Sequence, residues 1–280
     1  MQNLVKRRPV LSYCVLVMLW SFTWWGLILT VVPIGTLFDP PMNGAAIGFM
    51  LLGGIGPSLM GLVVTRIVAG PGSAWALIRR LGQWRVGWWW LAPLIPIALN
   101  FVVFRLYGWS SGQVAPAALG AKLVPAIILG LYAGLSEEFG WRGFLLPRLQ
   151  QRYSPLVSAL LVGLVWGGVW HLFGDYVGAF GGRGWWGVAL ALLQAPVLLG
   201  AFSVMLACVY NGARGSMLLC VLFHVAISFS GFVFDPAYPS SPVYFTWAAI
   251  FAALAWAAAG GLVLATRQRA ARDRMPLRAA

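Results

Sequence analysis

Long apolar runs separated by short polar segments form the main pattern of this chain. A membrane-spanning helix needs roughly 20 consecutive apolar residues. On that criterion the segments able to span a bilayer lie at about 11–33, 44–66, 88–106, 121–140, 156–173, 187–209, 215–234 and 243–265. The pattern predicts an all-α fold: a polytopic membrane helix bundle with about eight transmembrane helices, with residues 1–280 forming a single membrane domain.

The composition supports this prediction and excludes other classes of protein. Hydrophobic residues make up 61% of the chain and charged residues 9%, whereas soluble domains carry about 25% charged residues. The chain has 3 cysteines, and Cys14, Cys208 and Cys220 all lie inside apolar runs without a C-x-x-C spacing. Neither a disulfide framework nor a cysteine metal site is therefore expected.

The basic residues indicate how the helices are oriented. With the N-terminus placed in the cytoplasm, only Arg105, Lys122 and Arg183 of the 19 basic residues fall in outside segments. This bias is typical of membrane topology, and an even number of spans puts both termini in the cytoplasm. The net charge of +13 is thereby explained, so no nucleic-acid partner is expected. Residues 70–87, with apolar and basic positions on different faces, predict a helix lying in the cytoplasmic interface.

Ionisable groups within the apolar runs mark the candidate site. The only glutamates are Glu137 and Glu138, and the only histidines are His171 and His224. All four lie in or beside predicted spans. A charged group at membrane depth costs roughly 2.5 to 3.5 kcal/mol on insertion scales and usually marks a functional site. We therefore expect these residues to share one polar pocket.

Helix geometry separates the roles of the two glutamates. Glu138 and Arg142 are four residues apart, so they can pair on one helix face. Glu137 is rotated by about 100° from Glu138 and can face a different cavity. Measured from the turn at 152–155, Glu137 and His171 lie at depths of roughly 22 and 24 Å, and His224 lies about 15 Å from its own turn. Glu137 and His171 are therefore expected to meet, and the depth of His224 is compatible with the same site.

The order and spacing of these motifs resemble the CPBP family of intramembrane proteases, which includes type II CAAX prenyl proteases, Abi proteins and lysostaphin-resistance-like proteins. Glu137, Glu138 and Arg142 match its Glu-Glu-x-x-x-Arg motif. His171 matches the second motif, although the aromatic residue expected four positions earlier is replaced by Gly167, and Trp166 lies five positions earlier. The third motif, His-x-x-x-Asn, reads His224 to Ser228 here. The resemblance covers roughly residues 120–235, the expected catalytic core.

The resemblance implies a glutamic-type intramembrane endopeptidase that needs no cofactor. In such an enzyme Glu137 and His171 would activate a water, and His224 would stabilise the oxyanion, with Ser228 as a shorter donor in place of asparagine. Glu138 and Arg142 would support the site. The implied partners are membrane lipids and a membrane-anchored or prenylated peptide or protein substrate. The predominance of arginine over lysine, with abundant alanine and glycine, favours the plasma membrane of a bacterium.

Two alternatives remain open at this stage. Glu137, His171 and His224 are also a plausible zinc set, since two histidines and a glutamate hold catalytic zinc in some hydrolases. The H-E-x-x-H spacing of common zinc proteases is absent, which favours the metal-free mechanism. A transporter or a non-catalytic immunity or scaffold protein could also use such a buried polar cluster to bind a ligand.

Overall fold

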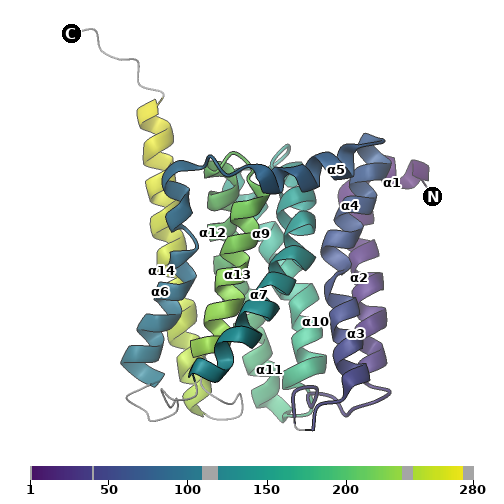
Figure 1. Cartoon of the computed structure of the whole chain (residues 1–280), viewed down its shortest axis with the longest axis vertical. Helices are drawn as coiled ribbons and strands as arrows, with labels where there is room; N and C mark the ends of the chain where they lie inside the picture. Colours follow the sequence, from purple (N-terminus) through teal and green to yellow (C-terminus); the bar gives the residue numbers. More distant parts are fainter. Residues whose placement is uncertain (1, 40, 109–118, 235–241, 274–280) are drawn as a thin grey trace.

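The chain folds into a bundle of long, roughly parallel helices (Figure 1). The computed structural model describes residues 2–39, 41–108, 119–234 and 242–273, and in these ranges it contains helices and connecting segments but no strand. The 8 helical segments long and apolar enough to cross a membrane are Pro9–Ile28, Gly44–Ala69, Gly87–Leu106, Gly120–Leu149, Pro155–Phe180, Gly184–Gly212, Met217–Phe234 and Phe245–Arg267. The predicted all-α, multi-pass architecture is confirmed.

Several spans consist of more than one helical element. The elements are α1 (Gln2–Arg7), α2 (Pro9–Ile28), α3 (Gly44–Gly54), α4 (Gly56–Ala69), α5 (Ser73–Ile78), η1 (Arg79–Gly82), η2 (Gly87–Leu91), α6 (Leu94–Val103), η3 (Phe104–Gly108), α7 (Leu119–Gly140), η5 (Trp141–Leu145), α8 (Leu146–Leu149), α9 (Pro155–Gly163), η6 (Leu164–His171), α10 (Leu172–Asp175), η7 (Tyr176–Phe180), α11 (Gly184–Leu192), η8 (Leu193–Leu198), α12 (Leu199–Gly212), α13 (Met217–Phe234) and α14 (Pro242–Asp273).

The segments η3, η5, η6, η7 and η8 are π-helical. A π-helix is a wider turn in which hydrogen bonds connect residues five apart, and short π segments are frequent at functional sites. Two of these segments directly follow or contain the motif residues identified from the sequence. The π turns therefore change which of these side chains share a helix face.

Two glycines let α7 and α13 pack closely in the middle of the bundle. A Cβ atom at Gly130 would lie 2.9 Å from the carbonyl oxygen of Val225, and one at Gly134 would lie 2.8 Å from that of Val221. Larger side chains would force the helices apart, because small residues allow membrane helices to approach backbone to backbone. This approach places the end of α7, which carries both glutamates, beside His224 on α13.

The fourth span differs from the sequence prediction of 121–140. It runs from Gly120 to Leu149, and Arg142 is fully buried within it rather than lying in a cytoplasmic segment. The span continues because Arg142 pairs with Glu138 inside the bundle, which lets a charged residue remain at membrane depth.

The segment 70–87 also differs in part from its prediction. It contains the short helices α5 and η1 rather than one continuous helix. In Figure 1 it runs across the upper end of the bundle, at the end where α1 and the Arg267 end of α14 also lie. We call this the basic end, because it carries exposed Arg66 in the last turn of α4 and, in the connections between spans, exposed Arg79, Arg85, Arg152 and Arg214. That this end faces the cytoplasm remains a prediction from the charge pattern. Of the basic residues assigned to it from the sequence, Arg274 and Arg278 lie outside the described residues.

Candidate active site

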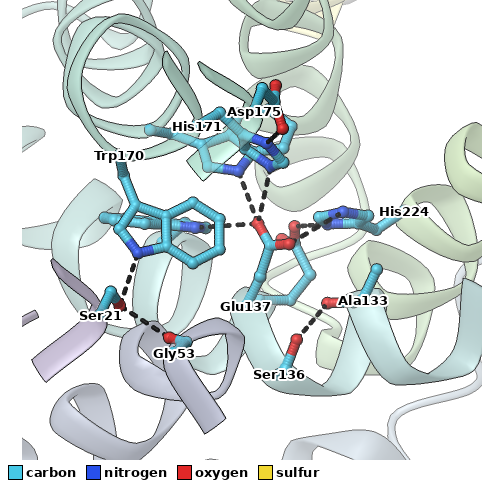
Figure 2. Close-up of polar contacts among 12 residues, drawn as sticks. Ser21, Gly53, Ala133, Ser136, Glu137, Trp170, His171, Asp175 and His224 are labelled. Carbon is cyan, nitrogen blue, oxygen red and sulfur yellow. Dashed lines mark hydrogen bonds and ion pairs between the residues drawn. The ribbon is translucent and has the colours of Figure 1, made fainter. Parts of the chain in front are cut away.

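Glu137 lies between the two histidines of the chain (Figure 2). Its Oε2 atom is 3.8 Å from Nε2 of His171, and its Oε1 atom is 3.7 Å from Nε2 of His224. Glu137 and His224 are buried, whereas the His171 side chain keeps 25% of its surface exposed. The structure therefore brings together the three residues that the depth comparison and the motifs predicted to meet, and access to them is on the side of His171.

Two indole groups hold the Glu137 carboxylate in place. Trp166 Nε1 donates a hydrogen bond of 2.6 Å to Glu137 Oε2, and Trp141 Nε1 donates to the same atom at 3.3 Å. Both tryptophans are fully buried. Hydrogen bonds to a charged acceptor are stronger than neutral ones, so these donors stabilise an ionised carboxylate in an apolar part of the bundle. The Oε1 atom remains directed toward His224.

A second carboxylate orients His224 from the opposite side of its ring. Nδ1 of His224 is 2.6 Å from Glu138 Oε1, and the same oxygen accepts a hydrogen bond of 2.9 Å from Arg142 Nη1. The pairing with arginine keeps Glu138 an acceptor, so His224 Nδ1 is the donor. Its Nε2 atom therefore points toward Glu137 in a fixed orientation. The predicted ion pair of Glu138 with Arg142 is present.

His171 is oriented in the same manner by a residue that the sequence analysis did not select. Its Nδ1 atom lies 3.4 Å from Asp175 Oδ1, one helical turn further along (Figure 2). The two histidines thus share one arrangement: a carboxylate faces Nδ1, and Nε2 faces Glu137. Such partners fix the ring orientation and the tautomer of a histidine.

The π-helical segment η6 explains how Trp166 reaches the site. Trp166 lies five residues before His171, one more than the family motif requires. In a π-helix, residues five apart occupy successive turns, so both side chains face Glu137. Their ring centroids lie 5.7 Å apart. The shift in spacing seen in the sequence is therefore compensated by the wider turn.

Arg142 carries the buried positive charge that balances the glutamates. It is fully buried, and its guanidinium lies 4.4 Å from the centre of the Trp166 ring. Among the described residues, its Nε and Nη2 atoms have no hydrogen-bond partner. The cation–π contact with Trp166 and the ion pair with Glu138 therefore stabilise this charge. Arg142 thus connects Trp166, which contacts Glu137, to Glu138, which orients His224.

Ser228 is not part of the side-chain hydrogen-bond network that joins the other candidate residues in the described part of the chain. It is half-buried on α13, one helical turn after His224. In the described part of the chain its hydroxyl forms no hydrogen bond to Glu137, His171 or His224. Its place in the site remains a prediction based on its position after His224.

Sequence reasoning missed Asp175 and the roles of Trp141 and Trp166. One signal for Asp175 was available: it is four residues after His171, the spacing of a helical pair. Trp166 also had a signal, its place five residues before His171, where the family motif has an aromatic residue at four. Nothing marked Trp141, because other tryptophans of the chain are exposed, as Trp75 and Trp185 are.

The histidine and glutamate separations also bear on metal binding. Among the described residues, no group of three or more His, Cys, Asp and Glu side chains has an arrangement that could hold a metal ion. A water molecule lying beside the line between Glu137 Oε2 and His171 Nε2 can hydrogen-bond to both, since 3.8 Å is too long for a direct bond.

Comparison with known proteins shows what the segment that carries this site resembles. Residues 118–230 match the family described as type II CAAX prenyl endopeptidase Rce1-like. This segment is Rce1-like. It contains every site residue predicted from the sequence and nearly coincides with the predicted core of 120–235, so the suspected relationship to type II CAAX prenyl proteases is confirmed.

A curated relative extends the comparison of the Rce1-like segment. The CAAX prenyl protease 2 of Methanococcus maripaludis is 31% identical over 147 residues, which cover 49% of this chain and 52% of the relative. The chain thus spans about half the length of the curated relative that it matches.

Proposed function

We propose that this protein is an intramembrane endopeptidase that hydrolyses a peptide bond of a membrane-associated or lipidated peptide or protein. The observation that supports this most directly is the position of Glu137 between two histidines whose Nε2 atoms both face its carboxylate. The relationship of residues 118–230 to CAAX prenyl endopeptidases supports the same reaction. We further propose, from composition, that it acts in the plasma membrane of a bacterium.

In this proposal Glu137 is the general base. Its Oε2 atom and His171 Nε2 position a water, Glu137 takes a proton from it, and the hydroxide adds to the scissile carbonyl carbon. Glu137 then gives the proton to the leaving nitrogen as the carbon–nitrogen bond breaks, which yields a carboxylic acid and an amine, and transfer of the acid's proton to the amine leaves a carboxylate and an ammonium group. General acid–base catalysis of this kind contributes about 100 to 10,000-fold.

His224 is the proposed donor to the oxyanion. Glu138 accepts from Nδ1, which leaves Nε2 facing the reaction site, and a protonated imidazole donates there. Ser228, one turn further along α13, is the second proposed donor. Preorganised donors of this type stabilise the charge that develops on the carbonyl oxygen.

An apolar cavity on the span that carries His171 supports the proposal that the substrate is associated with a lipid. It has a volume of about 420 Å³ and is lined by residues that include Phe22, Gly168, Leu172 and Phe173. His171 itself does not line the cavity, but Gly168 and Leu172 do, so an apolar chain held there would contact the same span that carries His171.

The decisive experiment compares wild-type protein with Glu137→Gln in proteoliposomes containing a farnesylated CaaX peptide. Hydrolysis in water labelled with oxygen-18 places one labelled oxygen in the new carboxylate, which mass spectrometry detects. The wild type should give this product and Glu137→Gln should not, although both should have the same unfolding temperature. A product of equal yield from the variant, or intact peptide after incubation with the wild type, would contradict the proposal.

The same assay distinguishes the alternatives. Full activity after chelation, with no zinc in the purified protein, would exclude the zinc mechanism that uses Glu137, His171 and His224. A transporter or a non-catalytic immunity or scaffold protein would give no labelled product at all.

A further inference from the structure

Two adjoining cavities lie at the basic end, separate from the candidate active site. The first, of about 440 Å³, lies among the start of α9, the end of α12 and the end of α14. The second, of about 660 Å³, lies between the segment 85–89 and the turn after α12. Asn211, Gly212 and Thr266 line both cavities, so the two lie side by side. None of the candidate catalytic residues lines either one.

The second cavity has a positively charged rim. Arg85 and Arg214 line it, and Arg267 lines the first cavity beside the shared Thr266. All three arginines are exposed. They come from three separate segments of the chain, no aspartate or glutamate lines either cavity, and none of the three forms an ion pair with a described residue. The cavity mouth therefore attracts an anion.

The turn that carries Arg214 is held by hydrogen bonds to residues 80–83, which directly precede the wall formed by residues 85–89. Gln83 Nε2 donates to the carbonyl of Arg214 at 3.1 Å, and Ser216 Oγ donates to the carbonyl of Gln83 at 2.6 Å. Arg80 donates to the carbonyl of Gly215. Arg214 has a φ of 54°, a left-handed conformation that costs free energy in a residue other than glycine. The contacts from residues 80–83 thus hold the turn that carries Arg214 against the segment that leads to Arg85.

The first cavity supplies an apolar compartment next to this basic rim. Its walls include Leu156, Ala159, Val204, Ala207 and Val263. The small side chains of the two alanines leave room between the helices. An apolar cavity that opens beside three arginines at the end of a helix bundle matches the shape and charge of a phospholipid with an anionic headgroup. A soluble anion, which has no acyl chain, would contact only the arginines and would leave the apolar cavity empty.

We propose that these cavities form a binding site for one anionic phospholipid, with the phosphate bound by Arg85, Arg214 and Arg267 and an acyl chain in the cavity lined by Val204 and Val263. Arginine suits this role, because its planar guanidinium makes paired hydrogen bonds to phosphate oxygens. This site is independent of the proposed hydrolysis, so either proposal can fail without the other.

Native mass spectrometry of the detergent-purified full-length protein tests the site directly. The probes are phosphatidylglycerol and phosphatidylcholine with the same acyl chains. The wild type should retain one phosphatidylglycerol, with an affinity at least about 10-fold above that for phosphatidylcholine. The triple variant Arg85→Gln, Arg214→Gln and Arg267→Gln should lose this preference.

A matched variant controls for total charge. Arg66→Gln, Arg79→Gln and Arg152→Gln remove the same charge from exposed positions at the same end that line neither cavity. This control should keep the wild-type preference. Equal losses in the two triple variants would show that binding reflects diffuse charge and would overturn the proposal.

Two further probes distinguish a lipid from a soluble anion. Dihexanoyl phosphatidylglycerol should bind more weakly than the long-chain lipid, because it cannot fill the apolar cavity. Glycerol phosphate should not compete at equal concentration. Equal binding of short and long chains, or effective competition by glycerol phosphate, would assign the arginines to a soluble anion and reject the phospholipid.

Discussion

Trp166 donates a hydrogen bond of 2.6 Å to Oε2 of Glu137, which is 29 residues earlier in the chain. This is the shortest contact that Glu137 makes among those with the surrounding indoles and imidazoles, and it joins the π-helical segment η6 to the end of α7. The bond fixes one carboxylate oxygen, while the other faces His224. The orientation of the proposed general base therefore depends on an indole that itself performs no chemistry.

Trp166→Phe removes this donor and keeps most of the ring. We expect kcat/KM for peptide cleavage to fall about 10 to 100-fold, because a hydrogen bond to a charged group is worth about 1.5 to 3 kcal/mol. The matched control is Trp247→Phe: Trp247 is also buried, and its Nε1 has no hydrogen-bond partner among the described residues. An equal loss in both variants would contradict a specific role for Trp166.

Asp175→Asn should lower kcat while KM and the unfolding temperature stay close to those of the wild type. Asp175 faces Nδ1 of His171 at 3.4 Å and acts only by positioning that ring. Replacing a carboxylate that orients a catalytic histidine can cost up to about 10,000-fold when the tautomer changes. Asp39→Asn, a change at a more exposed carboxylate, serves as the control.

A spectroscopic measurement distinguishes positioning from a merely structural effect of Asp175. The chain has only 2 histidines, so nitrogen-15 labelling of histidine gives two pairs of ring-nitrogen signals, one pair for each imidazole. Asp175→Asn should shift the ring nitrogens of one imidazole and leave the other, which faces Glu138, unchanged. Shifts of both or of neither would reject the assigned role.

The sequence predicted the membrane architecture and the meeting of Glu137 with His171, because both follow from one-dimensional quantities. Apolar run length sets the spans, and rise per residue sets the depth of a side chain. The extension of the fourth span was not predictable in this way, because it depends on burial of Arg142 against Glu138 and Trp166. The π turn at η6 was not predictable either. Two residues five apart face different sides of an α-helix but the same side of a π-helix, and the sequence does not show which helix type forms before His171.

Ser228→Asn tests the proposed second oxyanion donor. The longer amide extends further from α13 than the hydroxyl does, so we expect the cleavage rate to rise, by about 10-fold or more if an effective donor is gained. Ser228→Ala is the matched control and should lower the rate if the hydroxyl already donates. No change in either variant would remove position 228 from the site.

Glu138 and Arg142 make the sharpest prediction about stability, because both side chains are fully buried. Glu138→Gln leaves the guanidinium without its counter-charge and weakens the bond to His224, so we expect a loss of about 3 to 5 kcal/mol in the free energy of unfolding. Removing both charges, in Glu138→Gln with Arg142→Met, should recover much of that loss, because no buried charge is then left uncompensated. Thermal unfolding in detergent measures both variants.

The double variant also separates stability from chemistry. The amide introduced by Glu138→Gln cannot orient His224 as a carboxylate does, so the recovered stability should come without recovery of peptide cleavage. The exposed ion pair of Asp39 with Arg183, at 3.8 Å, gives the comparison: Asp39→Asn should cost less than about 1 kcal/mol. If the double variant regained full activity, Glu138 would serve only to neutralise Arg142, and the orientation of His224 would have to come from the packing of its ring against Trp166, 5.4 Å away.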